Sequence, residues 1–274
     1  MTTKNANAPS EDDAADMDAP DAVSDPNFMT SLARGLSVIR AFTERDQSLT
    51  IADVARITGL PRAAARRCLH TLTQLGYAGT DGRTYCLRPK ILALGYSYLS
   101  SSPLASTLDP VLERISRTLQ ESSSAGVLDE DDIVYVARAA TKRIMSVGLS
   151  VGSRLPAWST SIGRALLAHL PPAELDAYLA RVDLKPLTHL TLTDPDALRR
   201  ELEKIRRNGY ALVDQELEIG LRSVAVPIRN RAGAVVAAMN VSTQAARVSC
   251  AEMEERFLPI LLSAADDVRV SIGR

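Results

Sequence analysis

The sequence predicts an α+β protein of two parts, a helical N-terminal part and a larger C-terminal part built on an antiparallel sheet. Apolar residues recur every three or four positions between residues 28 and 75, which is the period of amphipathic helices. After residue 103, strand-like runs in hairpin order alternate with helical runs. The chain has 274 residues, enough for about two domains of roughly 150 residues each.

Composition limits the classes of protein to which the chain can belong. It is 46% hydrophobic and 24% charged, as globular proteins usually are. No apolar run reaches about 18 residues and the first residues lack a secretory signal, so we expect no membrane partner and a cytoplasmic location. The cysteines Cys68, Cys86 and Cys250 have no metal-ligand spacing, and no phosphate-binding loop or dinucleotide fingerprint appears. We therefore expect no metal and no cofactor.

Charge is distributed unevenly along the chain. Residues 1–27 hold one lysine and seven acidic residues with almost no large apolar side chain, so we expect a disordered acidic tail. Residues 28–90 hold ten arginines and lysines against four acidic residues, a net charge of +6. A clustered basic region is typical of proteins that bind nucleic-acid phosphates, and the alternative is a solvated basic face without a ligand.

Three helices are predicted between residues 28 and 76. The first, 28–44, has one apolar face. The second covers 53–57, with Thr50 as its N-terminal cap and Gly59 as its stop. The third covers 61–75, and the short turn between the second and third helices is typical of a helix-turn-helix.

The outer face of the third helix and a hairpin after it form the predicted DNA-binding surface. Asp81-Gly82 lies between two strand-like runs and predicts a two-residue turn in which both residues take positive φ. A basic hairpin after a helix-turn-helix is typical of a wing that contacts the DNA backbone or the minor groove. The residues expected to contact a double-stranded DNA operator are Arg34, Thr50, Pro61, Arg62, Ala63, Arg66, Arg67 and Arg83. The alternative is a helical interaction module.

These elements divide the chain into segments. Residues 28–89 form the winged helix-turn-helix domain, and the apolar run in 90–102 is expected to be a linker helix that ends in a serine-rich boundary. Residues 103–274 form the second domain. Its helices are expected at 104–119, 162–169, 172–181, 195–207 and 250–270, and its strands at 125–128, 133–139, 143–151, 209–214, 222–228 and 234–243.

Several motifs of the chain resemble the IclR family of bacterial transcription regulators, from Phe28 to the C-terminus. They are SLARGL at 31–36, DVA at 53–55, GLP at 59–61, LTQLGY at 72–77, PAWSTSIGRALL at 156–167 and GLRSVAVP at 220–227. The last two are most similar to the branch that governs the β-ketoadipate pathway and aromatic-acid catabolism. The resemblance implies a ligand-responsive regulator with a GAF-like effector fold in 103–274, which also carries oligomerisation. It implies a homodimer or homotetramer.

The effector that the resemblance implies is a small carboxylate: protocatechuate, 4-hydroxybenzoate or a β-ketoadipate-like acid. A regulator of unrelated carbon metabolism in the same family is the alternative. The pocket positions implied by the resemblance are Ser161, Ile162, Asp214, Ser223, Asn240 and Ser242. Polar residues that face a mostly apolar cavity would orient such a ligand.

The residues themselves add three candidates to the effector site. Arg222 interrupts an apolar strand and is costly to bury unless it is paired. It is expected either to bind the effector carboxylate or to pair with an acidic residue at 214, 216 or 218. Arg154 is the other candidate clamp, with a surface role as its alternative, and Trp158 could stack on an aromatic effector or simply pack.

One motif invites an enzymatic interpretation. Residues 148–152 match the G-x-S-x-G nucleophile elbow around Ser150. That elbow requires a helix directly after the serine, whereas Gly152, Ser153 and Pro156 follow here. We therefore expect no enzyme and no catalytic residue, with a serine hydrolase as the alternative.

Overall fold

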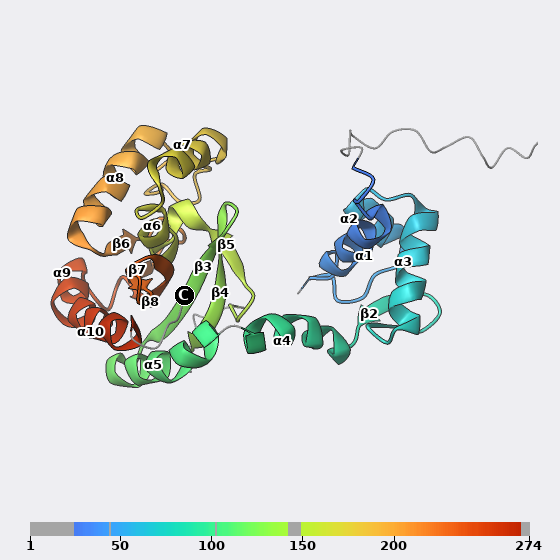
Figure 1. Cartoon of the computed structure of the whole chain (residues 1–274), viewed down its shortest axis with the longest axis horizontal. Coiled ribbons are helices and arrows are strands. Elements are labelled where there is room, and N and C mark those ends of the chain that lie inside the picture. The colour runs from blue at the N-terminus through green and yellow to red at the C-terminus, as the bar shows by residue number, and fades with distance from the viewer. Residues whose placement is uncertain (1–24, 44, 102, 142–148, 270–274) are drawn as a thin grey trace, which may run out of the picture. The chain divides into compact units, whose positions relative to one another are not determined.

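The computed structural model describes residues 25–43, 45–101, 103–141 and 149–269, and the chain forms two compact units, 1–92 and 93–274 (Figure 1). Most of the predicted acidic tail at 1–27 and most of the strand predicted at 143–151 lie outside the described residues. The linker helix predicted at 90–102 corresponds to a 3-10 turn at Pro89–Ile91 followed by α4 (Leu92–Ser101).

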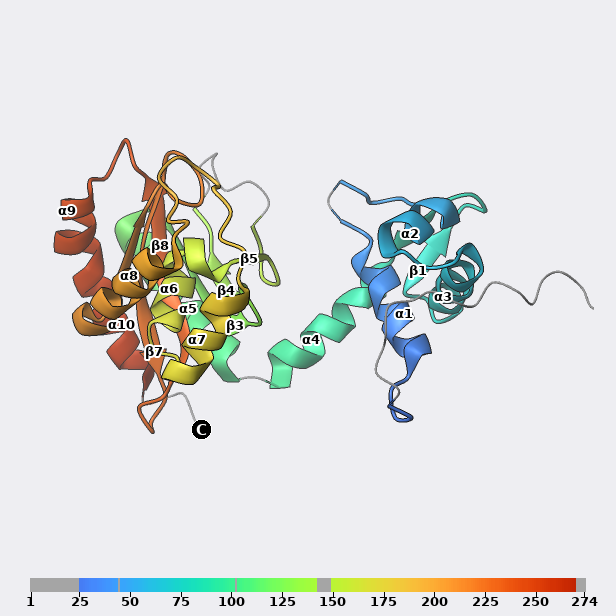
Figure 2. The same ribbon diagram turned by 90° about the horizontal axis from the view of Figure 1, so that it is seen from above.

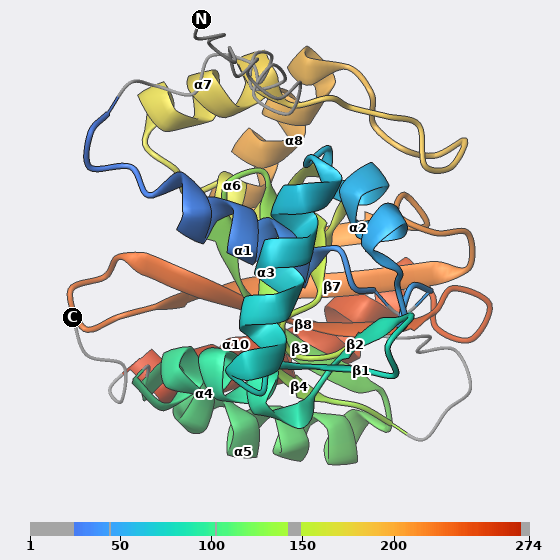
Figure 3. The same ribbon diagram turned by 90° about the vertical axis from the view of Figure 1, so that its right-hand side faces the viewer.

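The first unit is a small three-helix fold with a two-stranded hairpin. Its elements are α1 (Thr30–Arg40), α2 (Ile51–Thr58), α3 (Arg62–Gln74), β1 (Ala78–Thr80) and β2 (Tyr85–Leu87). Helix α3 packs against both α1 and α2 (Figure 3). Val38, Val54 and Leu69 contribute one fully buried side chain from each helix, so the apolar faces read from the sequence form this core.

Local chemistry ends these helices where the sequence indicates. The Thr50 hydroxyl accepts a hydrogen bond from the Asp53 amide, and the Asp53 carboxylate accepts one from the Thr50 amide, which is a capping box at the start of α2. Gly59 ends α2 with φ of 70°. Thr50 and Gly59 therefore set the two ends of α2, and the turn to α3 begins at Gly59.

The turn of the wing differs from the two-residue turn that the sequence predicts. Thr80 pairs with Tyr85, so the loop comprises 81–84, and only Gly82 takes positive φ. The Asp81 carboxylate accepts hydrogen bonds from the backbone amides of Thr84 and Arg83, which lower the pKa of Asp81 to about 2. These hydrogen bonds from the Asp81 carboxylate to neighbouring backbone amides stabilise the four-residue loop in place of a two-residue turn.

The described residues of the second unit form an antiparallel sheet of six strands in the order β5-β4-β3-β8-β7-β6. The strands are β3 (Ser122–Asp129), β4 (Asp132–Ala139), β5 (Arg154–Pro156), β6 (Ala211–Asp214), β7 (Leu221–Arg229) and β8 (Val235–Gln244). β7 pairs with β8 along its whole length, and β3 pairs with β8 through residues 122–126, both antiparallel, so the fold class predicted from the sequence is confirmed.

Helices cover both faces of this sheet. One face packs on α5 (Pro103–Leu119) and α10 (Leu258–Arg269), which follows α9 (Cys250–Glu252) and a π-helical turn (Met253–Phe257). The other face packs on α6 (Ser161–Leu167), α7 (Pro172–Arg181) and α8 (Pro195–Asn208), and Figure 2 looks onto this layer. In the part of the chain that the structure describes, no helix is long and apolar enough to cross a membrane.

Alternation along β7 and β8 decides which side chains meet each layer. Val224 and Met239 face α5 and α10, whereas Ala225 and Ala238 face α6. Farther along the same strands, the alternate residues whose side chains point to the α6 side of the sheet are polar. This polar end of the sheet lies opposite the start of α6.

Candidate functional site

A cavity of about 190 Å³ lies between the polar end of the sheet and the start of α6. It is smaller than the ~300–1,000 Å³ of pockets for drug-sized ligands, so it suits a compact molecule. Ser223 from β7 and Asn240 and Ser242 from β8 form its floor. Apolar area is supplied by Tyr135 and Ile162, among others.

Two segments far apart in the sequence form parts of the cavity wall. The first is the α6 wall, which we define as residues 159–162 at the start of α6 and in the 3-10 turn before it (Ala157–Ser159). The second is the β6–β7 turn, residues 217–221. Gly163 allows the first segment to be compact, because a Cβ atom there would lie 2.1 Å from the carbonyl oxygen of Ala157.

Polar groups without partners collect on this cavity. Among the described residues, five buried side-chain polar atoms lack a hydrogen-bond partner. Four of them belong to residues that line the cavity: Arg138 Nε, Ser159 Oγ, Asn240 Oδ1 and Thr243 Oγ1. A buried polar atom without a partner is costly, so such a cluster is typical of a site that a polar ligand completes.

Arg138, on β4, supplies a positive charge to the cavity. Its Nη1 donates a hydrogen bond of 2.7 Å to Ser124 Oγ, and its guanidinium carbon lies 5.8 Å from the centre of the Tyr135 ring. No carboxylate of the described residues pairs with it. The pair of Nε and the adjacent terminal nitrogen can bind one carboxylate through two hydrogen bonds.

A second arginine at the cavity is already paired. Arg247 Nη1 lies 3.0 Å from Glu121 Oε1, and both residues line the cavity. The Glu121 side chain is 7% exposed and that of Arg247 is 42% exposed. Arg138 is therefore the stronger candidate for an anion-binding group.

The structure brings together part of the effector site predicted from the sequence. The predicted residues that line the cavity are Ser161, Ile162, Ser223, Asn240 and Ser242. Arg154, Trp158, Asp214 and Arg222 do not line it. Arg154 instead pairs with Asp129 and Asp132 at the surface.

Arg222 has an internal acidic partner, which is one of the two roles expected for it from the sequence. Its Nε and Nη2 donate to the two carboxylate oxygens of Asp214 at 2.8 and 2.9 Å, and Nη1 donates to the Val248 carbonyl. The hydrogen bond from Arg222 lowers the pKa of Asp214. Trp158 is 4% exposed and packs in the core beside α6.

Arg138 was missed at the sequence level, although a signal for it exists. It interrupts the apolar strand 133–139 in the same way that Arg222 interrupts its own strand. The two arginines cannot be distinguished by pattern, because only the fold shows which one has a carboxylate neighbour. Among the described residues, no group of three or more histidine, cysteine or acidic side chains could hold a metal ion.

The predicted DNA-binding residues differ in their surroundings. Arg62, Arg66 and Arg67 are exposed on α3, and within the described residues no hydrogen bond or ion pair holds their side chains. Arg83 is exposed in the wing loop, and Pro61 and Ala63 are exposed at the start of α3. Arg34 is half-buried on α1, and the Thr50 hydroxyl is occupied by the capping box.

Replacing Thr50 by alanine should therefore destabilise α2. We expect Thr50→Ala to lower the free energy of unfolding by about 1 kcal/mol, because the Asp53 amide loses its acceptor. Urea denaturation followed by circular dichroism measures this change. Thr50→Ser, which keeps the hydroxyl, should unfold like the wild type, and equal stability of the alanine variant would contradict the capping role.

Ser150 lacks the surroundings of a nucleophile elbow. It is exposed in a turn where its amide donates to Ser153 Oγ and its carbonyl accepts from the Ser153 amide. The chain continues into β5 rather than into a helix, and Ser150 does not line the cavity. The geometry that the hydrolase alternative requires is not present at this serine.

Comparison with known proteins identifies both units. Residues 31–82 match the IclR helix-turn-helix domain, and residues 96–270 match the family described as bacterial transcriptional regulator IclR C-terminal. The chain belongs to the IclR family. It is a transcription regulator in which a DNA-binding helix-turn-helix precedes an effector domain, as the resemblance implied.

Individual relatives cover most of this IclR-family chain. The "Pca regulon regulatory protein" of Pseudomonas putida is 57% identical over 245 residues, covering 89% of this chain and 84% of the relative. A crystal structure of a transcriptional regulator from Rhodococcus sp. RHA1 has a TM-score of 0.80 and 50% identity, covering 88% of this chain and 97% of the other. A crystal structure of an IclR homolog from Microbacterium hydrocarbonoxydans in complex with 4-hydroxybenzoate has a TM-score of 0.73 and 27% identity, covering 87% and 97%.

Proposed function

We propose that this IclR-family chain regulates aromatic-acid catabolic genes and that its cavity binds a small carboxylate. The candidate effectors are protocatechuate, 4-hydroxybenzoate and β-ketoadipate. The observation that carries the proposal is the cluster of buried polar atoms without partners at the cavity, with the Arg138 guanidinium among them. The Pseudomonas putida and Microbacterium relatives support the chemical class of the ligand.

Each part of the cavity has a role in this proposal. Arg138 Nε and an adjacent terminal nitrogen bind the effector carboxylate. Ile162 and Tyr135 pack against its hydrocarbon part, and Ser159 and Asn240 hydrogen-bond its hydroxyl or keto oxygen. Burial raises the pKa of Tyr135, so its hydroxyl stays protonated.

Calorimetry with the three candidate acids tests the site. The wild-type chain should bind at least one of them, and Arg138→Met should weaken that binding about 10- to 100-fold, since a hydrogen bond to a charged group contributes about 1.5–3 kcal/mol. Arg181→Met is the matched control, because Arg181 pairs with Asp131 outside the cavity. Absence of heat with all three acids would remove the aromatic-acid proposal, and unchanged affinity in Arg138→Met would remove the role of that arginine.

The same proposal places α3 in the major groove of an operator in the cytoplasm, where the chromosome lies. Arg62, Arg66 and Arg67 have no competing intramolecular partner among the described residues, so they are available to base edges and phosphates. Arg83, in the wing loop, would contact the backbone or the minor groove. The response to effector is a coupling between these two binding equilibria.

Self-association completes the proposed assembly. Leu92 and Tyr96 on α4 are 70% and 69% exposed, and Leu32 and Leu36 lie one turn apart on α1 with 58% and 50% exposure. Large apolar side chains grouped on one helix face are typical of protein contacts, and a homodimer or homotetramer would cover them. Sedimentation equilibrium should give a multiple of 29.5 kDa for the wild type and a smaller mass for Leu92→Ser with Tyr96→Ser. A wild-type monomer at micromolar concentration would contradict self-association.

A further inference from the structure

A buried ion pair adjoins the cavity without lining it. Arg164, on α6, is 1% exposed, and its Nη1 and Nη2 donate to Glu216 Oε1 and Oε2, both at 2.6 Å. The third donor, Nε, binds the carbonyl oxygen of Trp158 at 2.8 Å. The guanidinium is thereby fixed in its plane by a bidentate pair on one edge and a backbone carbonyl on another.

The two partners adjoin different segments of the cavity wall. Arg164 is two residues beyond the α6 wall, and Trp158, which accepts its Nε, is one residue before that wall. Glu216 directly precedes the β6–β7 turn. The backbone at its other neighbour, Gln215, has a φ of 60°, which a non-glycine residue rarely adopts without support.

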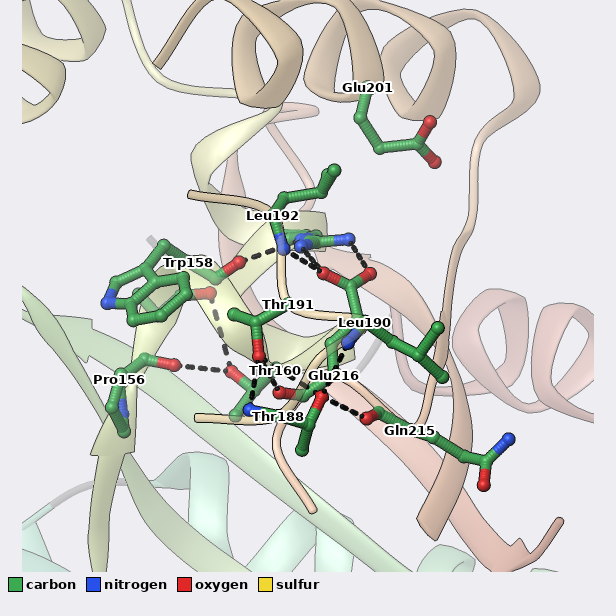
Figure 4. Close-up of polar contacts among 12 residues, drawn as sticks. Pro156, Trp158, Thr160, Thr188, Leu190, Thr191, Leu192, Glu201, Gln215 and Glu216 are labelled. Atoms are coloured by element: carbon green, nitrogen blue, oxygen red, sulfur yellow. Dashed lines mark hydrogen bonds and ion pairs between the residues drawn. The ribbon is translucent and has the colours of Figure 1, made fainter. Parts of the chain in front are cut away.

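A third segment, residues 188–192, is attached to the same carboxylate (Figure 4). The Leu192 amide donates to Glu216 Oε2 at 2.9 Å. Thr191 Oγ1 donates to the Glu216 carbonyl at 2.7 Å, and Thr188 Oγ1 donates to the Gln215 carbonyl at 2.8 Å. Glu216 therefore connects the turn both to α6 and to this loop.

Stability alone does not require an ion pair at this position. Well-packed apolar residues of similar volume often hold a buried site as well as an ion pair does, because two charges must lose their water. Apolar contacts, however, leave the distance and angle between two walls adjustable. A bidentate pair with further hydrogen bonds on both partners defines one relative position.

We propose that Arg164 and Glu216 are positioning residues that hold the α6 wall and the β6–β7 turn at the spacing required for effector binding. The inference rests on the proposed function, because it concerns the same cavity. The pair acts through Trp158 and through the backbone of the turn, without touching the ligand. Without it, the unit folds but the cavity walls shift relative to each other.

The test combines a double variant with a measurement that needs no ligand. Arg164→Met with Glu216→Leu replaces both charges by apolar side chains, so no charge is left buried without a partner. The directional bonds are lost, including the acceptor of the Leu192 amide, and we expect a smaller loss of stability than when one partner alone is removed. Trp158 is the only tryptophan of the chain, so quenching of its fluorescence by acrylamide reports access to the α6 wall. We expect at least about two-fold stronger quenching and faster amide exchange in residues 215–221.

Effector affinity is the second measurement, with the acid that gives heat with the wild type. We expect the double variant to bind it at least about tenfold more weakly, since the cavity is no longer preorganised. Arg206→Met is the matched control, because Arg206 bonds the carbonyls of Ala168 and Leu170 beyond the far end of α6. The control should match the wild type in quenching and in affinity.

The outcomes separate this inference from the proposed function. A stable double variant with wild-type quenching, exchange and affinity overturns the positioning role. If the double variant does not fold, Glu216→Gln decides by the same measurements, because it keeps the volume and loses the bidentate acceptor. If the wild type binds none of the three acids, the proposed function fails, while quenching and exchange still decide whether the pair holds the walls.

Discussion

Arg66→Ala combined with Arg67→Ala should abolish protection of the operator in a footprint of the region upstream of the regulated genes. Both side chains are exposed on α3 and lack intramolecular partners among the described residues. A good arginine contact to DNA contributes about 1–3 kcal/mol. Loss of two such contacts amounts to about 2–6 kcal/mol, a decrease in affinity of about 30-fold to 10⁴-fold.

The control for this experiment is an arginine pair of equal charge elsewhere. Arg114→Ala with Arg117→Ala removes two exposed arginines from α5, in the second unit. That variant should protect the operator like the wild type, because α5 is not part of the helix-turn-helix. Full protection by the α3 variant would show that α3 is not the recognition helix.

Glu216→Ala should lower the free energy of unfolding of the second unit far more than removal of an exposed charge does. It leaves the Arg164 guanidinium buried without a counter-charge and removes the acceptor of the Leu192 amide. Removing one partner of a buried pair costs about 3–5 kcal/mol, a large part of the stability of a typical domain. Urea denaturation monitored through Trp158 fluorescence measures the change.

An exposed pair in the same unit provides the comparison. Arg181 Nη2 lies 2.8 Å from Asp131 Oδ1, but the side chains of Asp131 and Arg181 are 42% and 50% exposed. Asp131→Ala should therefore change the free energy of unfolding by no more than about 1 kcal/mol. A similar decrease in the free energy of unfolding in both variants would show that the Arg164–Glu216 pair stabilises the fold no more than an exposed pair does.

Local signals in the sequence were sufficient for most of the architecture. Thr50 and Gly59 define the ends of α2, because a capping hydroxyl and a left-handed glycine act within a few residues. Apolar patterning found β3, β4, β6, β7 and β8, but it missed the edge strand β5, which has only three residues. The wing was found as well, but not the geometry of its turn, which depends on how the Asp81 carboxylate bonds its neighbours.

The candidate site could be predicted only in part, because tertiary contacts decide which of its charged side chains have a partner. Arg138 and Arg222 each interrupt an apolar strand, and the fold gives a carboxylate partner to Arg222 alone. Arg164 and Glu216 lie 52 residues apart, and no periodicity connects them. The serine and asparagine positions that line the cavity were proposed from the resemblance to the family.

Operator affinity measured with and without effector shows whether the cavity of the second unit controls DNA binding by the first. Fluorescence anisotropy with a labelled operator fragment gives the Kd for the wild type and for Arg138→Met. We predict that an effector concentration about ten times its wild-type Kd changes the operator Kd of the wild type by at least about fivefold. The same concentration should change the operator Kd of Arg138→Met less, because the variant binds the effector more weakly. An unchanged wild-type operator Kd, or an equal change in both proteins, would show that effector binding through Arg138 does not control DNA binding.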